Sequence, residues 1–79
     1  MSLATALATA KRWLSANLYR LRREQGLTQD QAAERADLDS RFYQRCEHGE
    51  VNASLATLAK LAKAFGVDPA VLLERSPRK

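Results

Sequence analysis

Apolar residues recur along this chain at intervals of three and four positions, the spacing that places side chains on one face of an α-helix. Runs that alternate apolar and polar residues, as a half-buried β-strand does, are absent from the sequence. Glycines and helix-capping residues divide the chain into five segments. The pattern therefore predicts an all-α fold of five helices.

Turn chemistry sets the expected boundaries of these helices. Each of the last four follows a residue that commonly caps a helix N-terminus, and the last continues with a proline, which suits the first helical position. The caps are Thr28, Asp39, Ser54 and Asp68. The corresponding ends are expected near Ala36, Gly49, Gly66 and either Leu73 or Glu74.

The first helix is expected to end before Gly26, but the pattern leaves its start open. At about 100° per residue, one apolar stripe joins Leu14, Leu18 and Leu21. In a continuous helix the same stripe would include Leu3, Leu7 and Ala10. Either one long helix runs through the N-terminal extension, or a helix that starts at Ser15 follows a frayed segment.

The composition fits one small helical domain. The chain has 79 residues, of which 46% are hydrophobic, and it contains only 3 Gly and 2 Pro. This supplies enough apolar side chains for a core, while β-rich folds are hard to fit to it. We expect an N-terminal extension at residues 1–13, the domain at residues 14–74 and a disordered tail at residues 75–79.

Charge is unevenly distributed along the chain. The net charge is +4, which permits a polyanionic partner. Residues 1–28 carry five basic and one acidic side chain, residues 29–54 carry three and six, and residues 55–79 carry five and two. Because the middle is acidic, nucleic-acid binding there would depend on the placement of individual basic side chains.

Reactive residues are too few for most catalytic or metal sites. The single cysteine, Cys46, excludes an intrachain disulfide and a cysteine-based zinc site, and the single histidine, His48, leaves too few ligands for most other metals. No nucleophile–base pair or paired carboxylate site can be assembled, so we expect neither an enzyme nor a cofactor. No apolar run approaches the ~18 residues of a membrane span, and the absence of a secretory signal favours a cytoplasmic protein.

The segment after Asp39 carries two kinds of side chain on opposite faces of its predicted helix. The apolar face consists of Phe42, Tyr43 and Cys46. The polar face consists of Ser40, Arg41, Gln44, Arg45 and His48. The preceding segment is short, only three residues connect the two, and its inner positions are the small residues Ala32, Ala33 and Ala36. Two short helices joined by a tight turn, with small residues at their crossing, describe a helix-turn-helix.

These residues resemble the Cro/repressor-type, lambda-repressor-like helix-turn-helix domain of the XRE family of bacterial regulators. The resemblance rests on Leu27-Thr28-Gln29, Ala32-Ala33, Leu38-Asp39-Ser40, Tyr43 and Glu47-His48-Gly49. Leu18 and Leu21-Arg22 resemble the first helix of that domain, and residues 52–67 resemble its fourth helix and the turn beyond. The match spans about residues 14–74 and implies DNA binding, without indicating which operator is read.

Some positions depart from the family pattern. Asp37 takes a turn position usually held by glycine, and Asp tolerates a left-handed backbone better than most residues. Ala32 and Cys46 are smaller than the usual aliphatic residues. We expect Phe42 or Tyr43 to fill the released volume, and we interpret Cys46 as a small core residue.

The resemblance implies that the third helix reads base edges in the major groove of DNA. Arg can bond guanine in a bidentate way, Gln suits adenine and Ser is permissive. We therefore predict Arg41 and Arg45 as the main base readers, with Ser40 and Gln44 secondary. The alternative interpretation is that this face is simply a solvated polar surface.

Other polar residues are predicted to position the protein on the phosphate backbone of DNA. They are Gln29, His48, Asn52 and Arg22. For the first three, the alternative is ordinary polarity at a helix start or in a loop. Arg22 and Glu47 resemble a family ion pair that ties the first helix to the end of the third, so a structural role is preferred for Arg22.

One such domain contacts too few base pairs to be selective, and dimers solve this by placing two reading helices about 34 Å apart on a palindromic site. We expect a homodimeric transcriptional regulator that binds a palindromic operator in double-stranded DNA. Its predicted subunit interface comprises Phe65, Val71, Leu72 and Leu73, which the stripe of Leu3 and Leu7 would extend. Phage-type repressor, restriction–modification controller and antitoxin all remain open.

A second hypothesis is that the chain uses the same fold as a protein-interaction module, similar to an antitoxin or a coactivator-like domain. The acidic middle of the chain and the N-terminal apolar stripe suit that role. Trp13 lies off the leucine stripe, and it either covers the domain or contacts a partner.

Overall fold

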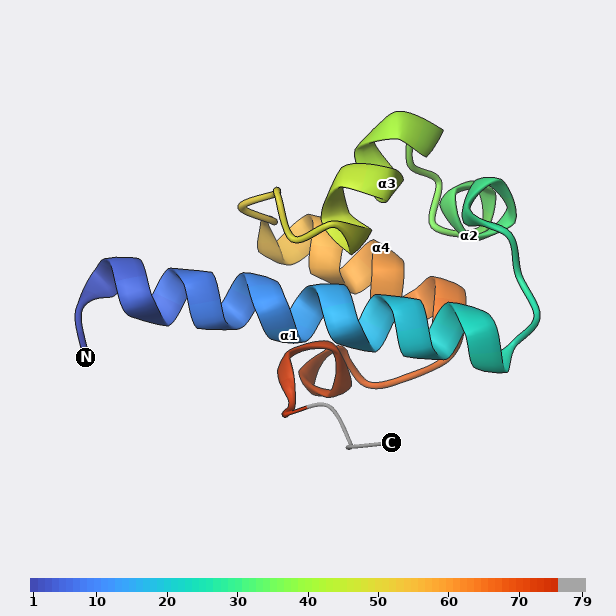
Figure 1. Ribbon diagram of the computed structural model, residues 1–79. Coiled ribbons are helices and arrows are strands. Elements are labelled where there is room, and N and C mark those ends of the chain that lie inside the picture. Colours follow the sequence, from blue (N-terminus) through green and yellow to red (C-terminus); the bar gives the residue numbers. More distant parts are fainter. Residues whose placement is uncertain (76–79) are drawn as a thin grey trace.

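The computed structural model describes residues 1–75, which form four α-helices followed by one 3-10 helix (Figure 1). The elements are α1 (Leu3–Glu24), α2 (Gln29–Arg35), α3 (Ser40–Glu47), α4 (Leu55–Phe65) and η1 (Pro69–Leu73). No strand occurs in this part of the chain, so the all-helical fold class is confirmed. Of the tail expected at residues 75–79, all but Arg75 lies outside the described residues.

The prediction of a fifth α-helix is wrong, because the segment after Asp68 is the 3-10 helix η1. The N–H of Val71 donates to the Asp68 carbonyl over 2.9 Å, and the N–H of Glu74 donates to the Val71 carbonyl over 3.4 Å. Both bonds span three residues, as in a 3-10 helix. With only five residues, η1 is too short for a ladder of α-helical bonds to develop.

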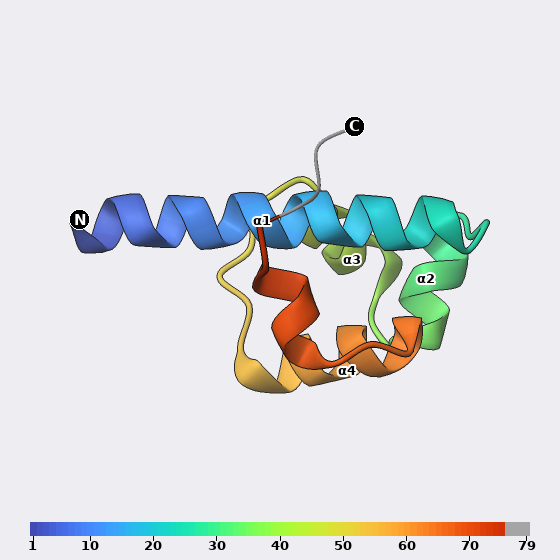
Figure 2. The same cartoon turned by 90° about the horizontal axis from the view of Figure 1, so that it is seen from below.

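The first helix, α1, is continuous over 22 residues. Its cap is Ser2, whose hydroxyl oxygen accepts a hydrogen bond of 3.1 Å from the Thr5 N–H. The long-helix alternative is therefore correct, and the boundary expected after residue 13 falls inside α1. Both views show the first turns of α1 extending past the rest of the molecule (Figures 1 and 2).

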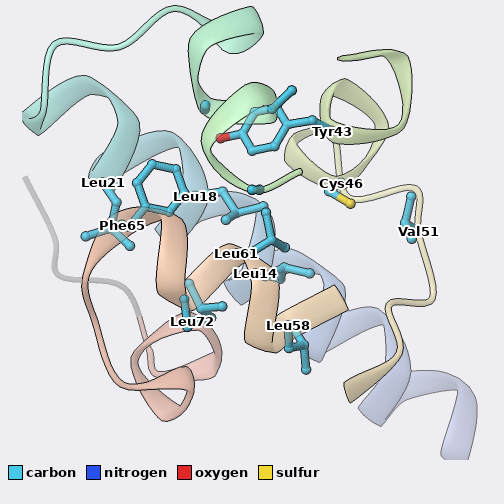
Figure 3. Close-up of a cluster of buried hydrophobic side chains, with 14 residues drawn as sticks. Leu14, Leu18, Leu21, Tyr43, Cys46, Val51, Leu58, Leu61, Phe65 and Leu72 are labelled. Atoms are coloured by element: carbon cyan, nitrogen blue, oxygen red, sulfur yellow. The ribbon is translucent and has the colours of Figure 1, made fainter. Parts of the chain in front are cut away.

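One cluster of buried apolar side chains joins α1 to the other elements (Figure 3). The largest of its fully buried apolar side chains are Leu18, Tyr43, Leu61 and Leu72. Tyr43 belongs to the same cluster as the small residues Ala32 and Cys46, whereas Phe42 is only partly buried. Tyr43 is therefore the aromatic residue that fills the core at this point.

Two of the four residues predicted at a subunit interface lie inside this core. Phe65 is 4% exposed and Leu72 is 0% exposed, because η1 folds back against both α1 and α4. These two side chains already pack within their own chain, so they present little surface to a second subunit. Val71 is half-buried and Leu73 is 42% exposed, so both remain accessible.

The turn between α2 and α3 is a Schellman motif whose left-handed residue is Asp37, with φ of 56°. The N–H groups of Asp37 and Leu38 donate to the carbonyls of Glu34 and Ala33 over 3.1 and 2.9 Å. Glycines take the equivalent positions after α1, α3 and α4. The chain thus adopts the turn despite lacking the usual glycine.

The end of the described chain is held against α1. The amide Nδ2 of the buried Asn17 donates to the carbonyls of Leu72 over 3.0 Å and Glu74 over 2.8 Å. The half-buried Trp13 ring has the guanidinium carbons of Arg12 and Arg75 at 5.2 and 5.8 Å from its centroid. These distances suit cation–π interactions, so Trp13 lies at the junction of α1 and the segment that follows η1.

Within residues 1–75, none of the helices has the length and apolar character needed to cross a bilayer. The same residues contain no group of three or more His, Cys, Asp or Glu side chains placed to hold a metal ion.

Candidate nucleic-acid interface

Helix α3 is fixed at both ends by its own local sequence. Its cap Asp39 accepts hydrogen bonds from the N–H groups of Arg41 and Phe42 over 3.0 and 3.2 Å. At the other end, Gly49 adopts φ of 75°, and the chain turns away toward α4. The inward side of α3 carries the buried residues Tyr43, Cys46 and Glu47.

The two predicted main base readers lie on the outer side of α3. Arg41 is exposed, and no ion pair within residues 1–75 involves it. The Arg45 side chain is 57% exposed, and its Nε lies 3.8 Å from Oε1 of the equally exposed Glu50. An exposed ion pair of this length contributes little stability, so Arg45 can exchange Glu50 for another partner.

The two secondary readers are partly engaged within the chain. Ser40 is half-buried, and its hydroxyl donates to Oδ1 of Asp30 on α2. Gln44 is also half-buried, and its Nε2 lies 3.5 Å from Ser40 Oγ. The bond to Asp30 connects the start of α3 to α2, while the contact of Gln44 with Ser40 lies within α3. Ser40 and Gln44 are therefore less available to an outside partner than the two arginines.

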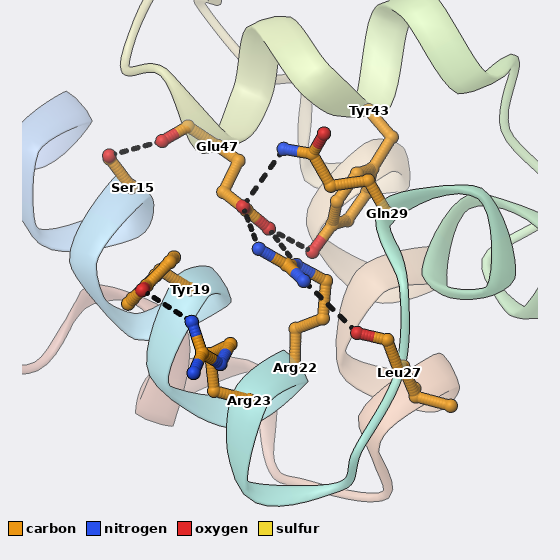
Figure 4. Close-up of polar contacts among 8 residues, drawn as sticks. All are labelled: Ser15, Tyr19, Arg22, Arg23, Leu27, Gln29, Tyr43 and Glu47. Atoms are coloured by element: carbon orange, nitrogen blue, oxygen red, sulfur yellow. Dashed lines mark hydrogen bonds and ion pairs between the residues drawn. The ribbon is translucent and has the colours of Figure 1, made fainter.

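The carboxylate of Glu47 is the centre of a buried hydrogen-bond network beneath α3 (Figure 4). Arg22 on α1 binds it in a bidentate way, with Nε donating to Oε2 over 2.8 Å and Nη2 donating to Oε1 over 2.7 Å. Tyr43 Oη donates to Oε2 over 2.7 Å, and Gln29 Nε2 donates to Oε1 over 3.0 Å. The remaining Arg22 nitrogen, Nη1, donates to the Leu27 carbonyl over 3.0 Å. The expected ion pair between Arg22 and Glu47 is therefore present, and it links α1, α2 and α3.

This network fixes the protonation states of its members. Burial alone would raise the pKa of Glu47, but hydrogen bonds from Arg22, Tyr43 and Gln29 outweigh burial and hold that pKa below its ordinary value. The hydrogen bond to Glu47 raises the pKa of Arg22. Burial, together with the bond to Glu47, raises the pKa of Tyr43 far above its ordinary value. At neutral pH the site thus contains a carboxylate, a guanidinium and a neutral phenol.

The residues predicted to contact phosphate fall into two groups. Arg22 and Gln29 are half-buried and point into the network around Glu47, and each donor nitrogen of their side chains already makes a hydrogen bond within the chain (Figure 4). His48 and Asn52 are exposed in the segment between α3 and α4. Only the second pair presents side chains that are free to reach a phosphate without rearrangement of the core.

Sequence reasoning missed a contact that holds the end of α3 against α1. Ser15 donates its hydroxyl proton to the Glu47 carbonyl (Figure 4). A Cβ on Gly49 would lie 3.6 Å from Ser15 Cβ and 3.7 Å from the Lys11 carbonyl, which shows how closely the helix end approaches α1. The sequence pattern offered Ser15 only as one possible start of the first helix and gave no sign of its partner, the Glu47 carbonyl 32 positions away.

A family model described as helix-turn-helix matches residues 18–72, from the middle of α1 into η1. The chain belongs to the helix-turn-helix family. The matched part contains α2 and α3 with the Asp37 turn between them, as the Cro/repressor-type resemblance implied. As a helix-turn-helix protein, the chain has the DNA-binding architecture of transcriptional regulators.

Individual helix-turn-helix proteins agree with this assignment. An uncharacterized HTH-type transcriptional regulator of Sinorhizobium fredii, y4dJ, is 37% identical over 57 residues, which cover 72% of this chain and 74% of the relative. The crystal structure of a hypothetical transcription factor from Neisseria, NHTF, matches with a TM-score of 0.79 and 28% identity, over 82% of this chain and 75% of that one. The restriction-modification controller protein C.AhdI from Aeromonas hydrophila matches with a TM-score of 0.73 and 33% identity, over 81% of this chain and 94% of that one.

Proposed function

We propose that this helix-turn-helix protein is a homodimeric transcriptional regulator that reads a palindromic operator in double-stranded DNA. In this proposal α3 enters the major groove, Arg41 and Arg45 read base edges, and Ser40 and Gln44 make secondary contacts. His48 and Asn52 contact phosphates near the end of α3. The protein acts by binding, without catalysis and without a cofactor, in the cytoplasm.

The observation that carries the proposal is the division of α3 into two sides. Arg41 and Arg45 are exposed, while Tyr43, Cys46 and Glu47 on the same helix are buried. The network at Glu47 uses side chains from three helices, so the orientation of α3 is fixed before any partner arrives. Two guanidiniums on a rigid, outward helix face suit bidentate bonds to guanine.

Selection of bound sequences from random duplex DNA, followed by footprinting, tests this proposal. We expect a consensus with two-fold symmetry, whose half-sites lie about 34 Å apart along the helix axis. Recovery of no consensus would overturn the reading of bases by α3. A consensus without symmetry would overturn the homodimer on a palindrome while leaving base reading intact.

Substitution of the readers tests the roles of individual residues. Arg41→Ala and Arg45→Ala are each expected to lower discrimination between the selected operator and a mismatched duplex by about 1–3 kcal/mol. Both side chains are exposed, so the thermal midpoint should stay close to that of the wild type. Lys60→Ala removes one positive charge from an exposed position of α4 and serves as the matched control. If the chain instead binds a protein partner with an affinity that neither salt nor the two arginine substitutions change, the result would favour a protein-interaction module.

A further inference from the structure

The first turns of α1 form an overhang, defined here as residues 3–10. Within it, Leu3 is 83% exposed, and the side chains of residues 4–6 and Ala8 are exposed as well. Both views show this part of α1 projecting beyond the other elements (Figures 1 and 2). The exposed side chains of the overhang, Leu3 above all, gain almost no burial from their own chain.

An apolar groove lies at the base of the overhang. Its walls include Leu7 and Leu14 of α1, Val51 of the segment before α4, Leu58 of α4 and Leu73 at the end of η1. Leu73 is 42% exposed at one side of it. The same surface therefore presents a ridge, the overhang with Leu3, and a hollow beside that ridge.

Charge distinguishes this surface from the rest of the molecule. Residues 1–10 carry no charged side chain, although 28% of all residues in the chain are charged. The groove has one basic lining residue, Lys11, and no acidic one. Two copies of a chain with net charge +4 repel each other over most orientations, and contact through this surface, whose one charged lining residue is Lys11, brings few like charges together.

We infer that a second copy of this chain covers this surface, with the overhang of each subunit lying across the groove of the other. A two-fold interface must be self-complementary, and a ridge and a hollow side by side on one surface meet that requirement. Leu3 of each subunit is then buried against the partner's groove. The inference rests on the proposed homodimer, and it moves the centre of the interface from the buried residues Phe65 and Leu72 to the start of α1.

Leu3→Lys tests this arrangement in the full chain. Because Leu3 is 83% exposed, the substitution removes almost no packing within one subunit, and the helical circular dichroism should be unchanged. In the dimer it buries two cations, so sedimentation equilibrium should show a dimer dissociation constant at least tenfold higher than that of the wild type. Ala8→Lys adds the same charge on the opposite, exposed side of the overhang and should leave the dissociation constant within about twofold.

Amide hydrogen exchange gives a second measurement that does not depend on a variant. As the protein concentration is raised, the amides of the overhang should exchange more slowly, while those at the middle of α4 should change little. Equal concentration dependence at both places would overturn the inference.

The outcomes separate this inference from the proposed function. If Leu3→Lys remains as dimeric as the wild type and still binds the selected operator, the overhang is not the interface, and base reading by α3 stands. A wild-type chain that stays monomeric at millimolar concentration would overturn the interface and the homodimer together. If Leu3→Lys becomes monomeric but the wild type selects no DNA sequence, the interface stands and the proposed reading of an operator fails.

Discussion

Glu47 shows how one buried charge can set the position of a binding helix. A carboxylate taken out of water is costly unless all its acceptor sites are used, and Glu47 accepts four hydrogen bonds from three side chains. Replacing such a group by an apolar residue need not lower stability, but removing one partner leaves the other charge unpaired. The residue therefore specifies the orientation of α3 more than it adds to the total stability of the fold.

Glu47→Gln keeps the shape of the side chain and removes its charge. We expect the free energy of unfolding at pH 7 to fall by about 3 kcal/mol, because Arg22 loses its buried counter-charge. The folded pKa of Glu47 lies below the unfolded value of about 4.3, so the ionised network stabilises the wild type above that pH and is lost as the pH falls through the folded pKa. Urea unfolding at a series of pH values should show the two proteins converging in acid.

The exposed carboxylate of Glu50 provides the control for that experiment. Glu50→Gln removes a charge whose side chain is 57% exposed and 3.8 Å from Arg45. The expected change is below about 0.5 kcal/mol at any pH. A difference between wild type and Glu47→Gln that stays constant down to pH 2 would argue against the ionised network.

Asp37 is the residue where the turn of the helix-turn-helix is under strain. A non-glycine residue at φ of 56° is disfavoured, and the Asp charge lies at the negative end of α2. Asp37→Gly should raise the free energy of unfolding by about 0.5–1 kcal/mol, the relief of strain being partly offset by the greater freedom of glycine in the unfolded chain. Thermal unfolding measures the change. Asp37→Ala removes the charge and should destabilise; if both variants destabilise equally, the left-handed strain is not the reason.

At the scale of elements, helix boundaries were largely predictable because caps and turns act within a few residues. The caps expected at Thr28, Asp39, Ser54 and Asp68 are all present. The start of α1 was ambiguous. Its Ala/Leu-rich pattern fits a helix, but the only local signal for a helix start there is the capping residue Ser2. The 3-10 character of η1 was not predictable, because it depends on how the segment after Gly66 packs against α1 and α4.

Asn17 is an element-scale connection that sequence reasoning missed. It lies beside the stripe of Leu14, Leu18 and Leu21 and is buried with them, so its amide needs hydrogen-bond partners. Its partners, the carbonyls of Leu72 and Glu74, are more than 50 positions away and could not be read from the pattern.

Asn17→Ala should therefore loosen η1 from α1. Two carbonyls lose their donor, and one of them is buried, so we expect the free energy of unfolding to fall by about 1–3 kcal/mol. Amide exchange should become faster at Val71 before it does so at Leu61 in α4. A uniform acceleration across both elements would indicate global destabilisation without selective release of η1.

At the scale of the whole molecule, we expect DNA binding to weaken as the salt concentration rises. The number of basic side chains that face the DNA sets how steeply it weakens, and this number is small because the part of the chain that contains α2 and α3 is acidic. Residues 29–54, which contain α2 and α3, have six acidic and three basic side chains. If the two exposed guanidiniums of each subunit, Arg41 and Arg45, displace about two counterions from the DNA, affinity for the selected operator should fall at least tenfold between about 50 and 200 mM salt. Fluorescence anisotropy with a labelled duplex measures the slope. A slope indistinguishable from zero would contradict a complex held by contacts between basic side chains and the phosphate backbone.

The surface of the whole molecule was the hardest feature to anticipate. Periodicity placed Phe65 and Leu72 among the apolar positions of their segments. It could not tell whether such a side chain faces the core of its own subunit or the surface of a second subunit. The candidate base readers were better placed, because the opposite side of α3 is so clearly apolar that Arg41 and Arg45 had to point outward. The Gln29 side chain points inward because its Nε2 donates a hydrogen bond to the carboxylate of Glu47. The sequence around α2 gives no sign of this distant partner.

Trp13 gives this chain a built-in optical reporter. It is the only tryptophan, and its ring touches the guanidinium groups of residues that lie near opposite ends of the sequence. Its emission wavelength should therefore shift when the segment after η1 leaves α1, even while the helical content is unchanged. Tryptophan fluorescence of the unlabelled protein would then distinguish local release of the segment after η1 from global unfolding.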